Sequence, residues 1–171
     1  MDHADPQVVR ELADKQAIRD VLTRYCRSMD RMDRDLALAV WHPGGTCEYV
    51  DMFEGTGAGF VDWVWEAHEG MLRHSHQITN VLIDVDGDHA VSEAYVTVAL
   101  WSPPEESPSE IVSRGRYLDR WSFRDGRWAI DHRVHVQDLM TMTPIPASSL
   151  EALSSRSRRD RDDPSYELFK E

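Results

Sequence analysis

The sequence predicts an α+β domain, a cone-shaped barrel in which a curved antiparallel sheet wraps around N-terminal helices. Apolar residues recur at three- and four-residue steps up to about residue 71, and the step changes to two after Arg73. These are the periods of amphipathic helices and half-buried strands. Helices followed by a run of strands are typical of the α+β class. The chain has 171 residues, a length that suits one domain burying roughly 70% of its extended-chain surface.

Two helices are expected first. The segment 6–32 carries apolar residues at helical spacing from Val8 and Leu12 onwards, behind a proline that a first helical turn tolerates. Asp33 is placed to cap a second, shorter helix that continues to about residue 41. The sequence His-Pro-Gly-Gly at 42–45 is expected to end that helix, because Pro and Gly interrupt helical structure.

A third helix is expected over residues 60–71, after a short strand at 46–52. A glycine-rich segment at 55–59 joins the two. It lacks the Lys-Ser/Thr of a P-loop and does not stand in a βαβ unit, so we interpret it as a flexible rim and not as a nucleotide site.

Four strands are expected in the second half, because it is rich in Val, Ile, Tyr, Trp and Thr. Asp-Gly pairs at 86–87 and 125–126 mark tight hairpins, and a Pro-rich stretch at 103–108 makes a longer connection. The strands therefore form an antiparallel meander over 77–85, 90–101, 110–123 and 127–137.

The folded domain is expected to cover residues 1–147. Residues 148–171 are expected to add a short helix at 148–153 and a Ser/Arg/Asp-rich segment at 154–164. Because the charges in this segment nearly balance, it is interpreted as a solvated tail or as a clasp over a neighbouring subunit.

The chain is acidic, with 19 Lys and Arg against 31 Asp and Glu and a formal charge of −12. Such a chain repels phosphate backbones and anionic lipids, so neither nucleic acid nor a membrane surface is an expected partner. Cys26 and Cys47 are too few for a disulfide framework and favour a reducing compartment. With no apolar leader and no stretch of ~18 apolar residues, the sequence predicts a cytoplasmic protein.

The last predicted strand has two different faces. Trp128, Ile130 and Val134 alternate with residues that include Arg133 and His135. In a cone, the face with Arg133 and His135 lines the pocket, where a polar side chain without a partner is costly. The apolar face then lies outside, beyond the reach of the helices, and predicts a homo-oligomer.

Asp30 and His76 are candidates for a His–Asp pair at the pocket mouth. Asp30 ends the first helix, and His76 heads a partly apolar strand face. A carboxylate can fix the tautomer of an imidazole and raise its basicity, while the free nitrogen removes a proton near neutral pH. A structural role in capping or strand pairing is the alternative for each residue.

Metal binding is the less favoured interpretation of His74-x-His76 and His132-x-x-His135. Neither pair is accompanied by an HExxH helix or a Cys partner. The acidic segment 84–88 has its glycine at the wrong position for a calcium loop. No metal site is expected.

Several stretches resemble SnoaL-like domains of the nuclear transport factor 2-like superfamily. They are the run from Ala17 to Asp33 with its continuation to Trp41, the motif His74-Ser-His76-Gln-Ile-Thr-Asn80, and the segment 115–128. The resemblance covers about residues 8–140. The pattern is most similar to that of scytalone dehydratase, hexachlorocyclohexane dehydrochlorinase and bile acid 7α-dehydratase, which are cofactor-free lyases with a His–Asp dyad.

The resemblance implies roles for four residues. Asp30 matches the aspartate at the helix end, His76 the histidine that takes the proton, and Arg133 the arginine that assists the leaving group. Tyr25 stands where the dehydrochlorinase has a Lys and the bile acid dehydratase a Tyr. A phenol can donate a hydrogen bond to departing oxygen, so Tyr25 favours a hydroxyl leaving group. At ~100° per residue, Tyr25 and Asp30 lie about 140° apart on the helix unless its end unwinds.

The resemblance therefore implies a cofactor-independent lyase, a homotrimer, acting on a small apolar cyclic substrate such as a steroid, polyketide, terpene or aromatic compound. Candidate pocket residues are aromatic or aliphatic, with core packing as the alternative for each: Trp41, Tyr49, Trp63, Met71, Tyr95, Trp101 and Tyr117. Two other functions stay open. One is a ketosteroid isomerase-like or polyketide cyclase-like enzyme with Asp30 as base, and the other is a module that binds a small molecule without catalysis.

Overall fold

The computed structural model describes residues 5–102, 108–146, 148–149 and 156–169. Helices come first and long strands follow, as the sequence predicts. The elements in chain order are α1 (Pro6–Arg31), α2 (Arg34–Ala39), β1 (Trp41–Tyr49), β2 (Phe53–Thr56), α3 (Gly57–Glu69), β3 (Arg73–Asp86), β4 (His89–Trp101), β5 (Ser109–Arg124), β6 (Arg127–Pro144) and α5 (Ser165–Leu168).

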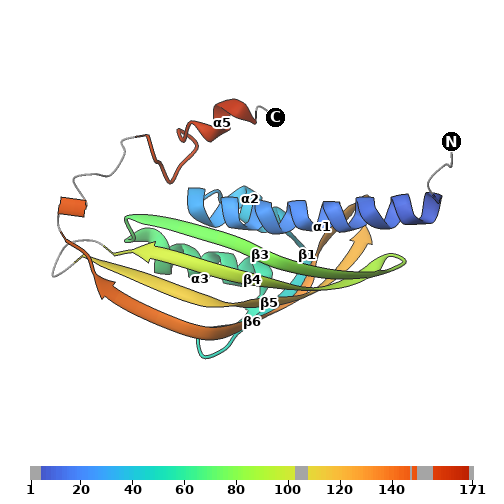
Figure 1. The fold of residues 1–171 in the computed structure, drawn as a ribbon, viewed down its shortest axis with the longest axis horizontal. Coiled ribbons are helices and arrows are strands. Elements are labelled where there is room, and N and C mark those ends of the chain that lie inside the picture. Colours follow the sequence, from blue (N-terminus) through green and yellow to red (C-terminus); the bar gives the residue numbers. More distant parts are fainter. Residues whose placement is uncertain (1–4, 103–107, 147, 150–155, 170–171) are drawn as a thin grey trace.

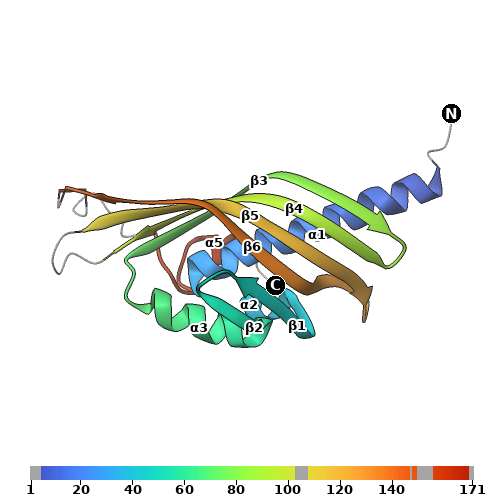
Figure 2. The same cartoon turned by 90° about the horizontal axis from the view of Figure 1, so that it is seen from below.

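One curved, open sheet of six strands runs in the order β2-β1-β6-β5-β4-β3. The strands β3 to β6 form the predicted antiparallel meander. The sheet is not antiparallel throughout, because β1 pairs with β6 in the parallel direction. Helix α1 runs along the concave side of the long strands, with α2 and α3 on the same side (Figures 1 and 2). This is the α+β cone that the sequence predicts.

Helix α1 starts and ends with well-defined caps. The Asp5 carboxylate accepts a hydrogen bond from the backbone N–H of Gln7, and Met32 adopts a left-handed conformation at the C-terminal end. The buried face begins only at Ile18. Val8 and Leu12 are exposed, because the first turns of α1 extend past the sheet (Figure 2). The apolar stripe that the sequence predicts is therefore shorter than its periodicity suggests.

The glycine-rich segments are ordered parts of the fold. Asp33 caps α2 as predicted, but α2 ends at Ala39 and the 42–45 segment belongs to β1. The prediction of a flexible rim at 55–59 is wrong, because this segment ends β2 and begins α3. A Cβ added to Gly57 would come within 2.3 Å of the Trp41 ring. Only glycine lets α3 start so close to β1.

The predicted outer face of the last strand is wrong. Trp128 and Ile130 are buried in the core, and Arg133 and His135 are buried as well. A one-residue bulge at Asp131 shifts the pairing of β6 with β5, and such an extra residue reverses the alternation of side chains. The apolar face that suggested a homo-oligomer is thus absent here, and the homotrimer stays a prediction.

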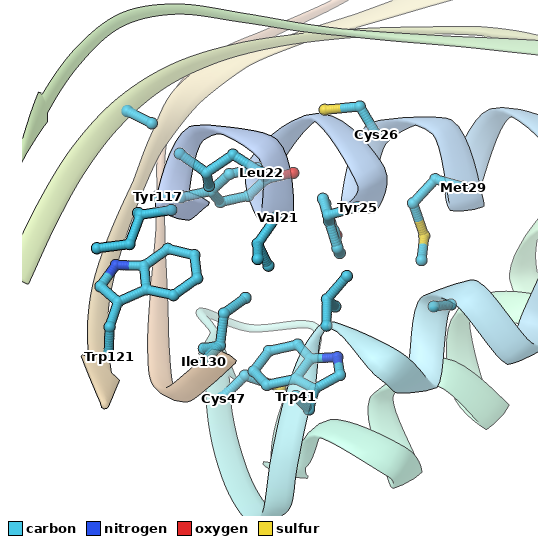
Figure 3. Close-up of a cluster of buried hydrophobic side chains, with 14 of the residues drawn as sticks. Val21, Leu22, Tyr25, Cys26, Met29, Trp41, Cys47, Tyr117, Trp121 and Ile130 are labelled. Atoms are coloured by element: carbon cyan, nitrogen blue, oxygen red, sulfur yellow. The ribbon is translucent and has the colours of Figure 1, made fainter. Parts of the chain in front are cut away.

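The core lies between α1 and the concave face of the sheet (Figure 3). Side chains from α1 meet side chains from β1, β5 and β6, and the labelled members are Val21, Leu22, Tyr25, Cys26, Met29, Trp41, Cys47, Tyr117, Trp121 and Ile130. Both thiols are buried and unpaired, and burial raises the pKa of each to about 12. Among the described residues, no helix is long and apolar enough to cross a membrane.

The described C-terminal segment 156–169 is not a solvated tail. Hydrogen bonds and an ion pair hold it to α1, to the N-terminal cap of α2 and to the C-terminal end of α3. Arg159 donates to the carbonyl of His68 at 2.7 Å, and Tyr166 donates to Asp33 at 2.7 Å. Residues 148–149 are helical, and the remainder of the helix predicted at 148–153 lies outside the described residues.

Candidate active site

Asp30 and His76 lie together at one end of α1. The ring nitrogen Nδ1 of His76 is 2.7 Å from Oδ1 of Asp30, and the His76 backbone N–H donates to both carboxylate oxygens at 3.0 and 3.1 Å. The side chains are only 5% and 16% exposed. Because a carboxylate can only accept, Nδ1 carries a proton, and in the neutral ring the lone pair is then on Nε2. Asp30 thus holds both the backbone and the imidazole ring of His76.

Tyr25 reaches the same histidine without any unwinding of the helix. Helix α1 continues through Arg31, and the Tyr25 ring meets the His76 ring edge-on, with 6.4 Å between their centroids. Its hydroxyl is hydrogen-bonded to that of Tyr49 at 2.9 Å. Burial raises the pKa of Tyr25, so the phenol stays protonated at neutral pH. Tyr25 is thus a core residue whose protonated phenol lies on the ring next to His76.

Arg133 is fully buried and paired with a carboxylate that the sequence reasoning missed. Its Nε and Nη2 atoms donate to the two oxygens of Asp119 at 2.7 and 2.8 Å. Burial alone would lower the pKa of Arg133, but Asp119 raises it well above its ordinary value. The guanidinium also lies 4.3 Å from the Tyr25 ring centre and 4.0 Å from that of Tyr117. Its Nη1 is buried without a hydrogen-bond partner among the described residues.

His135 is a second residue to which sequence reasoning gave no role. It lies between Tyr49 and Tyr117, with ring centroids 5.0 and 5.5 Å away. Burial, helped by the charge of Arg133, lowers the pKa of His135 to about 4, so the ring is uncharged at neutral pH. Its Nδ1 has no partner among the described residues. The alternation of the last strand predicts that His135 faces the pocket, and the structure buries it on the inner side.

His68 and His74 stand beside the dyad. Their ring centroids are 4.4 Å apart, and Nδ1 of His74 lies 3.2 Å from the carbonyl oxygen of Met29, which can only accept. Burial lowers the pKa of His68 to about 3 and that of His74 to about 4. Within the described part of the chain, no cluster of three or more His, Cys, Asp or Glu has a geometry suited to a metal ion.

The candidate pocket residues do not all share one cavity. A pocket of about 530 Å³ opens beside Asp30, and Trp101 and His74 contribute to its wall. Tyr95 lies on the outer face of β4 and is 44% exposed, so it is not part of the interior. The other candidates are either buried core residues or half-buried: Trp41, Tyr49 and Tyr117 in the first group, and Trp63 and Met71 in the second.

The open, curved sheet around N-terminal helices is the cone fold of the nuclear transport factor 2-like superfamily. The SnoaL-like domain family matches residues 10–134, so the chain belongs to this family. No curated protein matches the chain in sequence.

Three solved structures show how widely this fold is shared. A candidate scytalone dehydratase from Novosphingobium aromaticivorans is 21% identical with a TM-score of 0.70, and the match covers 80% of this chain and 92% of that one. A hexachlorocyclohexane dehydrochlorinase from Novosphingobium barchaimii is 17% identical with a TM-score of 0.67, covering 81% and 94%. A protein of unknown function from Mycobacterium tuberculosis is 22% identical with a TM-score of 0.68, covering 95% and 89%. At these identities the likeness shows the fold alone.

Proposed function

We propose that the protein is a cofactor-independent lyase that removes water from a small cyclic substrate. The observation that carries the proposal is the hydrogen bond between Asp30 and Nδ1 of His76, two side chains that are largely buried. This bond leaves Nε2 as the one basic atom of the ring, because the carboxylate fixes the tautomer. A base with its orienting partner is the minimum that proton abstraction from carbon needs.

In the proposed reaction, Nε2 of His76 takes a proton from the carbon next to the one that bears the hydroxyl. The electrons of that C–H bond form the double bond, and the C–O bond breaks. Tyr25 donates its proton to the departing oxygen, so one water leaves. The Arg133 cation against the Tyr25 ring stabilises the phenolate that forms, because it offsets negative charge in a site from which water is excluded. Proton transfer from His76 back to Tyr25 then restores the enzyme.

The shape of the site and the relatives favour a compact substrate. The pocket beside Asp30, at about 530 Å³, falls within the range of small-molecule sites. Two structural neighbours bear the names of elimination enzymes, a candidate scytalone dehydratase and a hexachlorocyclohexane dehydrochlorinase. Asp30 already accepts hydrogen bonds on both oxygens, so it suits an orienting role better than that of the base in an isomerase.

Incubation with hydroxylated steroids and polyketide-like phenols tests the proposal. Mass spectrometry should find a product lighter by one water with the wild-type protein and none with His76→Gln. Binding of these compounds without turnover, or turnover that His76→Gln leaves intact, would contradict it.

Tyr25→Phe is expected to lower kcat for dehydration by about 100-fold while KM changes little, because the hydroxyl acts only as oxygen departs. Phe keeps the ring that packs on Arg133 and Tyr117, so the melting temperature reports any packing loss. Tyr49→Phe is the matched control, since it removes only the neighbouring hydroxyl at 2.9 Å, and a smaller loss is expected. Dehydration by Tyr25→Phe within about threefold of wild type would remove Tyr25 from the mechanism.

A further inference from the structure

Arg73 and Arg159 form an uncompensated pair of cations at the rim of the candidate active site. Both side chains are half-buried, and they line one pocket of about 450 Å³ together with Leu72 and Ser157. Arg73, Leu72 and Ser157 also line the pocket beside Asp30. The two pockets therefore adjoin, and Arg73 stands between them.

Neither arginine has a carboxylate partner among the described residues. Arg73 donates to the carbonyl of Leu72 at 2.6 Å, and Arg159 donates to the carbonyl of His68 at 2.7 Å. The Nε atom of each is buried without a hydrogen-bond partner in the described part of the chain. A buried guanidinium N–H that donates to nothing costs free energy, and an acceptor supplied by a ligand would recover it.

Other half-buried arginines are compensated within the protein. Arg31 pairs with Asp163 at 3.2 Å, and Arg116 pairs with Asp138 at 3.4 Å. Arg27 lies 4.4 Å from the centre of the Tyr166 ring. The chain has a net charge of −12 and therefore an excess of carboxylates. Two adjoining arginines that lack a carboxylate partner in such a chain form a site that favours an anion.

The groups around the pair leave its charge in place. Burial and, after it, the positive charge of Arg73 lower the pKa of Arg159. His68 and His74 are uncharged at neutral pH. At the rim, Glu69 is exposed and forms no ion pair with a described residue, and Asp160 is held by Arg158 at 2.7 Å.

We propose that Arg73 and Arg159 bind a carboxylate group carried by the substrate of the adjoining pocket. A guanidinium fork matches the two oxygens of a carboxylate, and two forks from different elements hold it between β3 and the C-terminal segment. The substrate class is then a cyclic acid, with its ring in the pocket beside Asp30. This inference rests on the proposed function only in assigning the acid to the molecule that reacts.

Calorimetric titration with 2-naphthoate and its neutral analogue 2-naphthamide tests the site without turnover. Wild-type protein should bind 2-naphthoate about tenfold more tightly or better, because hydrogen bonds to a charged group are stronger than neutral ones. Arg73→Gln and Arg159→Gln should each lower the affinity for 2-naphthoate about tenfold and leave the affinity for 2-naphthamide unchanged. Equal affinity of the wild type for the two probes would overturn the proposal even if a variant failed to fold.

Two further variants test whether the preference for 2-naphthoate comes from these two arginines, from the overall charge of the protein or from the catalytic dyad. Arg114→Gln removes an exposed cation of β5 and should leave the preference for 2-naphthoate intact. His76→Gln should also keep that preference, so a protein that shows it without dehydrating any compound would sustain the anion site and refute the lyase. A preference for 2-naphthyl phosphate over 2-naphthoate would overturn the assignment of a carboxylate.

Discussion

His76→Gln and Asp30→Asn are each expected to lower kcat for dehydration by about a thousandfold or more, with cooperative melting retained. Gln at position 76 has no basic nitrogen, so proton abstraction loses its acceptor. Asn at position 30 cannot hold the histidine in one tautomer, because its amide offers both a donor and an acceptor. Steady-state kinetics and thermal melting of the same preparations check both effects.

The double variant should lose little more activity than either single one, because the two residues act as a unit. His132→Gln is a matched control. The His132 ring on β6 is hydrogen-bonded to the Thr46 hydroxyl, and in the described interactions it contacts neither Asp30 nor His76. If loss of activity merely follows loss of folded protein in the dyad variants, Asp30 and His76 are structural.

Asp119→Ala is expected to lower the free energy of unfolding by about 3–5 kcal/mol, because it leaves Arg133 charged, buried and without its carboxylate. Both side chains of this pair are 0% exposed, so in the native protein each charge depends on the other and not on solvent. Urea denaturation followed by far-UV circular dichroism measures the change.

A second Arg–Asp pair across the same two strands provides the comparison. Arg124 and Asp131 form an ion pair with 50% and 32% of their side chains exposed, and Asp131→Ala should cost no more than about 1 kcal/mol. Asp119→Leu combined with Arg133→Met should recover most of the stability lost in Asp119→Ala, since it removes both charges. Equal losses in Asp119→Ala and Asp131→Ala would contradict the account of the buried pair.

The parts of the fold that the sequence predicts are those encoded locally. Helical spacing, the Asp33 cap and the two Asp-Gly turns each depend on neighbours in the chain, and the structure has each of them. The placement of Asp30 at a helix end and of His76 on an inward strand face also follows from local periodicity. That these two residues approach each other is what the resemblance to SnoaL-like lyases implies, because periodicity alone does not say which histidine meets Asp30.

The features that the sequence does not predict depend on partners distant in the chain. The bulge at Asp131 is a mismatch between two strands. It lets Trp128 and Ile130 face inward as well as the predicted His135. The parallel pairing of β1 with β6 likewise has no local signal. Asp119 gains its importance only from the arginine opposite it, and Arg159 reaches the site only because the C-terminal segment folds back onto α3.

The tautomer of His76 tests the central claim most directly, because the proposed base depends on it and no substrate is needed. Nitrogen-15 NMR of the imidazole at pH 8, where a free imidazole is neutral, distinguishes a protonated Nδ1 from a protonated Nε2. We expect His76 to be wholly in the Nδ1–H form in the wild type and to become a mixture of tautomers in Asp30→Asn. A wild-type His76 that carries its proton on Nε2, or that exchanges between the two forms, would contradict the assignment of Nε2 as the base.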